Sequence, residues 1–179
     1  MKKEVVLIDG SNNHACCKAL GFNLDYAKLL KLFPDLFRAY YFTALPPSSM
    51  ESSVRPMVDY LSYNGYSVIQ KEAKVYHNEG ALKPKVKGNM DCELILTAVD
   101  MVEYMTDLHL FAGDGDFSAM VAWVKLRGVR VTVWSSIKTN PPMISDNLRR
   151  EADYFIDLAD VRGQIEQGST ETVKIRWRK

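Results

Sequence analysis

The chain has 179 residues, of which 47% are apolar and 25% are charged, and its formal net charge is +1 at pH 7. These values are typical of one compact domain with a buried core, and the near-zero charge excludes a protein that is basic overall. No apolar run approaches the roughly 18 residues of a membrane-spanning helix, so we expect no membrane partner.

The start of the chain and its cysteines predict the cellular compartment in which the protein is found. The four aliphatic residues that follow Glu4 are too few for the apolar core of a secretory signal, which takes about 7–15 residues. The chain has three cysteines, of which Cys16 and Cys17 are adjacent, and this number does not make a disulfide framework. We therefore expect a reducing, cytoplasmic location.

Short β-branched runs alternate with helical patterns along the chain, which predicts an α/β fold with a parallel sheet covered by helices. Residues 4–8 are typical of a buried strand that ends at Asp9. An apolar stripe over residues 24–33 predicts a helix that Pro34 stops. The pattern then predicts a strand over residues 36–43, a helix ending near Tyr63, a strand over residues 66–70 and a loop or ragged edge hairpin over residues 71–87.

The alternation continues in the second half of the chain. It predicts a helix over residues 89–104, a strand over 108–112, a helix over 117–126, a strand over 130–134, a short helix opened by Ser145 and a last strand over 154–158. The final residues resemble an appendage, so we expect one domain over residues 1–160 and a basic extension over residues 161–179. Within that extension, Val173–Lys179 alternates apolar and basic residues, as in a phosphate-tracking arm with a stacking tryptophan or in a charged edge strand.

Four aspartates fall at the ends of these expected elements. Asp9 follows the first strand, Asp91 opens a helix, and Asp114 and Asp116 follow the fourth strand in the run Gly-Asp-Gly-Asp-Phe. Ligands of open α/β sheets collect beyond the carboxyl ends of the strands, so these carboxylates share one crevice if the two strands are neighbours. Gathered carboxylates raise each other's pKa unless a cation neutralises them. Hard oxygen ligands suit Mg²⁺ or Mn²⁺, which are the usual agents of phosphodiester cleavage.

Each motif also has a plainer interpretation. The residues Asp9-Gly10-Ser11-Asn12 are ordinary turn formers, and Asp116 is able simply to cap the helix that follows it. Asp100 lies half a turn out of phase with Asp91, which predicts a surface position. A zinc site at His14, Cys16 and Cys17 is disfavoured, because adjacent cysteines do not easily offer both thiolates to one tetrahedral ion.

Together the segments around these aspartates resemble the NYN family of PIN-like nucleases, in particular its bacterial LabA-like branch. The resemblance covers roughly residues 4 to 158, and the segments that carry it are Ile8–Asn12, Lys87–Asp91, Ala112–Phe117 and Leu148–Leu158. The family often has serine where Ala112 and Gly115 stand here. Neither departure changes an acidic position.

The resemblance implies a PIN-like three-layer α/β/α sandwich with a mainly parallel central sheet. It also implies a Mg²⁺ or Mn²⁺ site and the activity of a metal-dependent endoribonuclease acting on RNA, single-stranded by expectation. The implied catalytic and metal-binding residues are Asp9, Asp91, Asp114 and Asp116, and the substrate-binding residues expected beside them are Ser11, Asn12, Lys87, Arg149 and Arg150. A homodimer, formed through a sheet edge or the C-terminal segment, is also compatible with the sequence.

Two other functions stay open. A haloacid-dehalogenase-type phosphatase also carries an aspartate at the end of its first strand, but it needs a second one two residues later, where Ser11 stands. A non-catalytic RNA-binding module would keep the fold without the reaction. The intact acidic set argues against that module, because gathered carboxylates are costly without a cation.

Overall fold

The computed structural model describes residues 2–47, 54–76 and 85–168. At its centre is a six-stranded sheet in the order β3-β2-β1-β6-β7-β8, in which every pair of neighbouring strands is parallel. The strands are β1 (Glu4–Asp9), β2 (Leu36–Leu45), β3 (Ser67–Glu72), β6 (Asp107–Phe111), β7 (Arg130–Ser135) and β8 (Tyr154–Asp157). The predicted α/β fold with a mainly parallel sheet is therefore confirmed.

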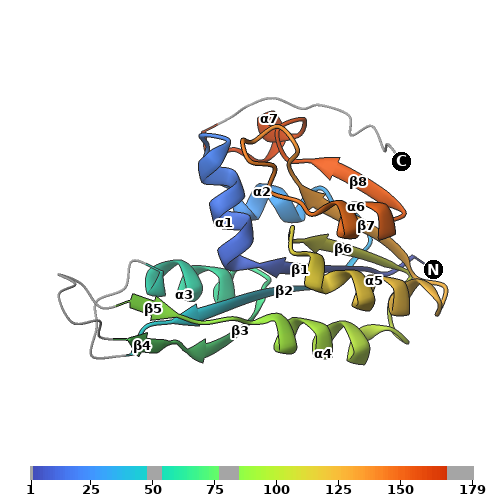
Figure 1. The fold of residues 1–179 in the computed structure, drawn as a ribbon, viewed down its shortest axis with the longest axis horizontal. Coiled ribbons are helices and arrows are strands. Elements are labelled where there is room, and N and C mark those ends of the chain that lie inside the picture. Colours follow the sequence, from blue (N-terminus) through green and yellow to red (C-terminus); the bar gives the residue numbers. More distant parts are fainter. Residues whose placement is uncertain (1, 48–53, 77–84, 169–179) are drawn as a thin grey trace.

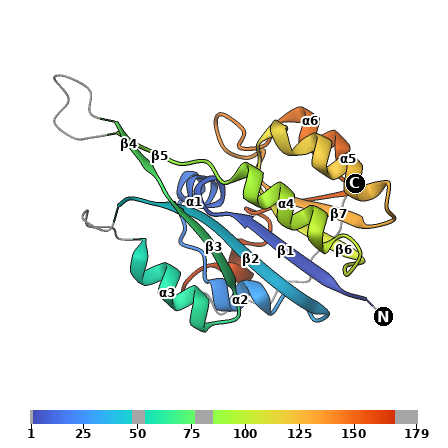
Figure 2. The same cartoon turned by 90° about the horizontal axis from the view of Figure 1, so that it is seen from below.

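Helices cover both faces of this sheet and complete a three-layer sandwich (Figure 1). One face carries α4 (Asp91–Met101), α5 (Ser118–Lys125) and α6 (Asp146–Glu151). The other carries α1 (Gly10–Ala19), α2 (Tyr26–Leu30), α3 (Arg55–Tyr63) and α7 (Arg162–Ile165). The short antiparallel pair β4 (Lys74–Tyr76) and β5 (Lys85–Lys87) extends beyond the main sheet, which confirms the expected edge hairpin (Figure 2).

Strand β1 lies in the middle of the sandwich and is buried on both faces, as central strands of parallel sheets are. Val5 and Leu7 point into the core beneath α4 and α5, whereas Val6 and Ile8 point into the core beneath α1. All four side chains are fully buried. Because β1 also pairs with β6, with Ile8 opposite Phe111, both strands deliver their following residues to the same edge of the sheet.

Three helical segments differ from the sequence-based expectation. Helix α1 begins at Gly10, where a turn was expected, because the Asp9 side chain accepts hydrogen bonds from the first backbone amides and caps it. Helix α2 is five residues long, shorter than the predicted stripe over residues 24–33. Helix α7 lies in the part of the chain that was expected to be an appendage.

Residues up to Gly168 pack against the sandwich. The Ile165 side chain is fully buried, and its carbonyl oxygen accepts a hydrogen bond of 2.7 Å from the Asp25 amide. The basic segment Val173–Lys179 lies outside the described residues, so the division into residues 1–160 and 161–179 stays a prediction. Within the described ranges, no helix combines the length and the apolarity needed to cross a membrane.

Candidate functional site

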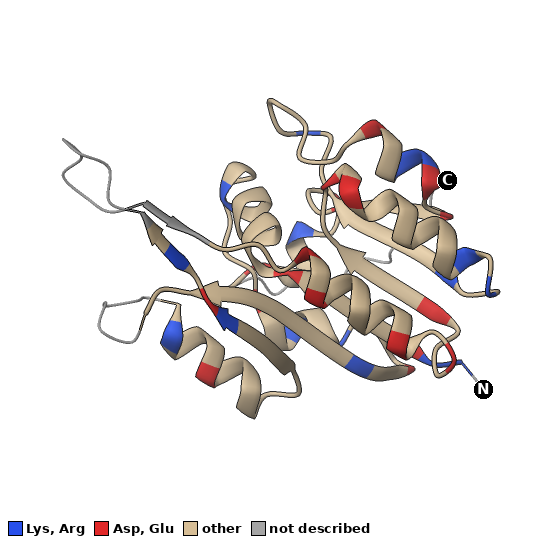
Figure 3. Cartoon of the chain, turned by 60° about the horizontal axis from the view of Figure 1, so that its bottom comes forward, with Lys and Arg blue, Asp and Glu red and all other residues tan. Residues whose placement is uncertain are grey.

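Three carboxylates from two separate segments meet at the carboxyl-terminal edge of the sheet. Asp91 is the first residue of α4, Asp114 precedes the short 3-10 helix η1 (Gly115–Phe117), and Asp116 lies within η1. One oxygen atom from each carboxylate lies within 4.8 Å of the others. Asp91 is half-buried and the other two are exposed. Figure 3 shows acidic ribbon at the start of α4 and at the start of the η1–α5 segment, on one side of the molecule.

Local hydrogen bonds hold these carboxylates in place. The Asn89 side chain accepts a hydrogen bond of 2.6 Å from the Asp91 amide and donates another of 2.6 Å to Asp91 Oδ2. Asn89 thereby satisfies the first backbone amide of α4. Asp114 Oδ1 accepts a hydrogen bond of 3.0 Å from the Asp116 amide, so Asp114, rather than Asp116, caps the helical turn that follows.

The loop that carries Asp114 is fixed by a close backbone approach. The Gly113 carbonyl oxygen accepts a hydrogen bond of 2.8 Å from the Ser145 amide, which ties the loop to the start of α6. A Cβ atom at Gly113 would lie 1.7 Å from the Met143 carbonyl oxygen, which leaves room for glycine alone. Residues 143–145 thus set the position of the aspartates from across the loop.

Asp9 lies next to the three carboxylates but is engaged elsewhere. Its Oδ1 accepts hydrogen bonds from the Ser11 amide at 3.0 Å, the Ser11 hydroxyl at 2.7 Å and the Asn12 amide at 3.1 Å. These bonds cap α1, and they leave Oδ2 outside the cap. The negative charge of Asp9 nevertheless reaches Asp91, since it helps to raise the pKa of that carboxyl.

The electrostatics of the cluster favour a cation. Burial raises the pKa of Asp91, the hydrogen bond from Asn89 partly offsets this, and the charges of Asp9, Asp114 and Asp116 raise the pKa further. A bound cation would reverse these repulsions, and three carboxylates are the hard oxygen donors that Mg²⁺ and Mn²⁺ prefer. The residues present therefore fit a divalent metal ion. For the described residues, the cluster of Asp91, Asp114 and Asp116 is the one group of this kind that the geometry yields.

The expected substrate-binding residues have different surroundings. Ser11 and Asn12 serve the Asp9 cap at the edge of the cluster. Lys87 ends β5, and its side chain lies outside what the structure describes.

Arg149 and Arg150 lie in the last turn of α6, whereas the other end of that helix meets the Asp114 loop. The Arg149 guanidinium lies 5.1 Å from the centroid of the Phe155 ring, a contact with β8 rather than with the carboxylates. The structure thus gives Arg149 a packing contact, and its role toward a substrate stays a prediction.

One ion pair of helix α4 was not predicted. Lys71, on the edge strand β3, donates to both carboxylate oxygens of Glu93 at 2.8 and 2.9 Å, in the first turn of α4. Both side chains are partly exposed. The pairing joins residues 22 positions apart across the edge of the sheet, and no local sequence signal reports it.

The adjacent cysteines play no part in the acidic cluster. Burial raises the pKa of the Cys16 thiol to about 11 and that of the Cys17 thiol to about 12, so both stay protonated at neutral pH. Both side chains pack in the core beneath α1.

Comparisons with known proteins match most of the chain. A family model described as NYN domain matches residues 3–159. The low amplitude and bright protein LabA of Synechococcus elongatus is 30% identical over 168 residues, which are 90% of this chain and 87% of that protein. A crystal structure of a protein of unknown function from Vibrio parahaemolyticus superposes with a TM-score of 0.70 at 24% identity, over 88% of this chain and 93% of that one. This last likeness shows a shared fold.

Proposed function

The chain belongs to the NYN domain family, within the PIN-like nuclease superfamily, and from this membership we propose that it is a divalent-metal-dependent ribonuclease. It would hydrolyse phosphodiester bonds in single-stranded RNA. The observation that carries the proposal is the convergence of Asp91, Asp114 and Asp116 within 4.8 Å. Carboxylates gathered at one edge of a sheet repel each other, and a bound cation would remove this repulsion.

The residues of the cluster have separate tasks in this proposal. Asp91, Asp114 and Asp116 would hold Mg²⁺ or Mn²⁺, and Asn89 orients Asp91 through its two hydrogen bonds. Asp9 adds negative charge beside them and, through its cap, fixes the start of α1. When bound, the ion supplies Lewis-acid polarisation of the scissile phosphate and a water of lowered pKa.

The remaining assignments belong to the same proposal. Ser11, Asn12, Lys87, Arg149 and Arg150 are the proposed contacts to the RNA backbone. We also propose a cytoplasmic location and a catalytic domain over residues 1–160 with a basic extension over residues 161–179. A homodimer is compatible with this function and is not required by it.

The test is cleavage of a labelled single-stranded RNA by the purified protein with Mn²⁺ or Mg²⁺. We expect Asp114→Asn to abolish cleavage while its thermal melting shows a folded protein. Asp100→Asn is the matched control, because Asp100 is an exposed aspartate of α4 outside the cluster. Equal cleavage by the wild type and Asp114→Asn would contradict the proposal. Tight RNA binding in EDTA with no cleavage on adding metal would instead identify a non-catalytic binding module.

A further inference from the structure

A second site lies beside α1, on the face of the sheet opposite α4 and α5. A cavity of about 650 Å³ opens between α1, α2 and α3. That volume is in the range of small-molecule sites in proteins. Its walls include Asn13, His14 and Lys18 from α1, Tyr26 from α2, and Met57 and Tyr60 from α3. None of these residues belongs to the acidic cluster.

Asn13 brings a buried amide group to this cavity. The residue is 2% exposed, and its Oδ1 has a long contact of 4.0 Å with the Cys17 thiol. Its Nδ2 makes no hydrogen bond within the described part of the chain. The amide also interacts with the Tyr26 hydroxyl: this contact offsets part of the rise that burial causes in the pKa of Tyr26, although it does not reach normal hydrogen-bond geometry. A buried donor without a partner is unfavourable, and a ligand with a carbonyl oxygen or a ring nitrogen would relieve it.

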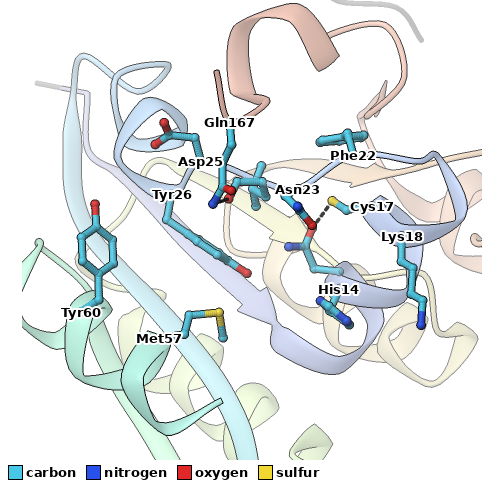
Figure 4. A pocket seen from close by; sticks show the side chains of 12 residues that line it. His14, Cys17, Lys18, Phe22, Asn23, Asp25, Tyr26, Met57, Tyr60 and Gln167 are labelled. Atoms are coloured by element: carbon cyan, nitrogen blue, oxygen red, sulfur yellow. Dashed lines mark hydrogen bonds between the residues drawn. The ribbon is translucent and has the colours of Figure 1, made fainter. Parts of the chain in front are cut away.

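The walls beside Asn13 suit a flat ring. Tyr26 is held by edge-on contacts with Tyr41 and Tyr66, at centroid distances of 5.5 and 5.8 Å. Figure 4 shows Met57 and Tyr60 on one side of the cavity, with the Tyr26 ring between them and α1. Tyr60 is 47% exposed, which leaves much of this side chain accessible. Aromatic and thioether side chains of this kind are common partners of stacked rings.

The opposite rim carries one ammonium group, that of Lys18. His14 and Lys18 lie on the α1 side of the cavity in Figure 4, and both are exposed. In the described ranges, Lys18 forms no ion pair. An ammonium group at the mouth of a ring-binding cavity suits an attached phosphate.

The position of the cavity relates it to the acidic cluster. Helix α1 begins directly after Asp9, and Asn13 follows one helical turn later, a rise of about 6 Å along the helix axis. Lys18 follows within two further turns. Asp9 and the residues of α1 that line the cavity therefore lie along one helix, within the length of a few nucleotides of a single strand.

We propose that this cavity binds one nucleotide unit, with its base beside Tyr26 and Tyr60, a base acceptor at Asn13 and its phosphate at Lys18 and His14. The inference rests on the proposed function in taking that unit to be a residue of the RNA strand. Recognition of single-stranded RNA commonly combines stacking with hydrogen bonds to the base edges, so the cavity gives the protein a base preference near the cut.

The test measures binding without cleavage. Anisotropy of a labelled single-stranded RNA is titrated in EDTA with the Asp114→Asn protein, and adenosine, guanosine, cytidine and uridine 5′-monophosphates are titrated by calorimetry. Tyr60→Ala and Lys18→Glu remove the stack and the charge from the cavity. The matched controls are Tyr63→Ala, another exposed tyrosine of α3, and Lys31→Glu, an exposed lysine, and neither of these residues lines the cavity.

We expect Tyr60→Ala and Lys18→Glu each to weaken RNA binding by about tenfold, the size expected for losing one base stack or phosphate contact, with both controls unchanged. The monophosphates would compete with the RNA. If Tyr60→Ala weakened monophosphate binding but not RNA binding, the cavity would bind a free mononucleotide. The inference that it binds a residue of the RNA strand would then be overturned. Equal RNA binding by all variants, with no monophosphate bound, overturns the inference entirely. Cleavage by the wild type is measured separately, so the ribonuclease proposal survives or fails on its own.

Discussion

The fold and the neighbouring carboxylates disfavour the ionised form of Asp91. Its pKa is raised by burial and by three neighbouring carboxylates, so folding favours its protonated form. A group with a raised carboxyl pKa stabilises the fold below its ordinary pKa and loses that contribution as pH rises through the raised value. At neutral pH in EDTA, Asp91→Asn should therefore melt at a higher temperature than the wild type.

Binding of Mn²⁺ should reverse this order of melting temperatures. Mn²⁺ binds the folded state and should raise the melting temperature of the wild type, but raise that of Asp91→Asn little or not at all. Asp100→Asn serves as control and should respond to Mn²⁺ as the wild type does. If Asp91→Asn melted below the wild type in EDTA, Asp91 would be a structural residue rather than a repelled ligand.

Gly113 sets the position of Asp114 by having no side chain. Gly113→Ala would place its Cβ 1.7 Å from a backbone carbonyl oxygen, and the backbone has to move. We expect a loss of about 1–3 kcal/mol in the free energy of unfolding, measured by urea denaturation, and a weaker response to Mn²⁺. Gly115→Ala is the control, because its Cβ would meet a side-chain atom, Ser145 Oγ, at 3.1 Å rather than the backbone. Similar losses in both variants would contradict this account of the loop.

At the scale of elements, Asp9 joins β1 to α1, and its charge also acts on Asp91 in the acidic cluster. Asp9→Asn keeps an oxygen acceptor for the amides of Ser11 and Asn12, whereas Asp9→Ala removes it. We expect Asp9→Ala to lower the free energy of unfolding by about 1 kcal/mol, the usual effect of losing a cap, and Asp9→Asn to retain the wild-type value or exceed it. The two urea curves measure this difference.

The response of the same variants to Mn²⁺ separates the two roles of Asp9. If its charge supports the cation, Asp9→Asn should lose part of the thermal stabilisation by Mn²⁺ although its cap is intact. A full Mn²⁺ response in Asp9→Asn would reduce Asp9 to a helix cap.

The strands of the sheet were predictable, and the helix after β1 was not. Val5 to Ile8 form an uninterrupted apolar run because both faces of β1 are buried, and such runs are readily recognised. The residues that open α1 favour turns in isolation, and they form a helix because Asp9 caps them and Cys16 and Cys17 pack on the sheet. That tertiary support has no counterpart in the local pattern.

The meeting of Asp9 and Asp114 at one edge of the sheet was predictable for a similar topological reason. Asp9 and Asp114 follow strands that pair with each other, and parallel neighbours end at one edge of the sheet. The separate role of Asp9 was not predictable, since the sequence does not show that one of its carboxylate oxygens accepts the hydrogen bonds that cap α1. The cavity beside α1 also left no sequence signal, because it is formed by three helices whose packing depends on the whole fold.

At the scale of the whole molecule, the two ends of β1 place carboxylates in opposite environments. At the carboxyl-terminal end, aspartates lie close together and repel each other, and a bound cation would remove this repulsion. At the other end, Glu4 is 2% exposed and is compensated within the protein. Its Oε2 accepts a hydrogen bond of 3.2 Å from the Asp35 amide, and its Oε1 lies 3.5 Å from His109 Nε2. Trp134 donates to the other nitrogen of that ring, so Nε2 is the nitrogen that presents its proton to Glu4.

Burial alone would raise the pKa of Glu4, but the contacts with His109 and Lys2 outweigh it and lower the pKa from 4.5 to about 2. A lowered carboxyl pKa contributes stability that is present above pH 4.5 and is lost as the pH falls through about 2. We therefore expect Glu4→Gln to be less stable than the wild type at pH 7, and to lose less stability between pH 4.5 and 2. Urea midpoints measured over that range, with the exposed Glu103→Gln as control, give the comparison. If the stability of Glu4→Gln and that of the wild type changed with pH in parallel, the ionised carboxylate of Glu4 would be no better stabilised in the folded protein than in the unfolded chain. The buried pairing would then add nothing to the stability of the fold.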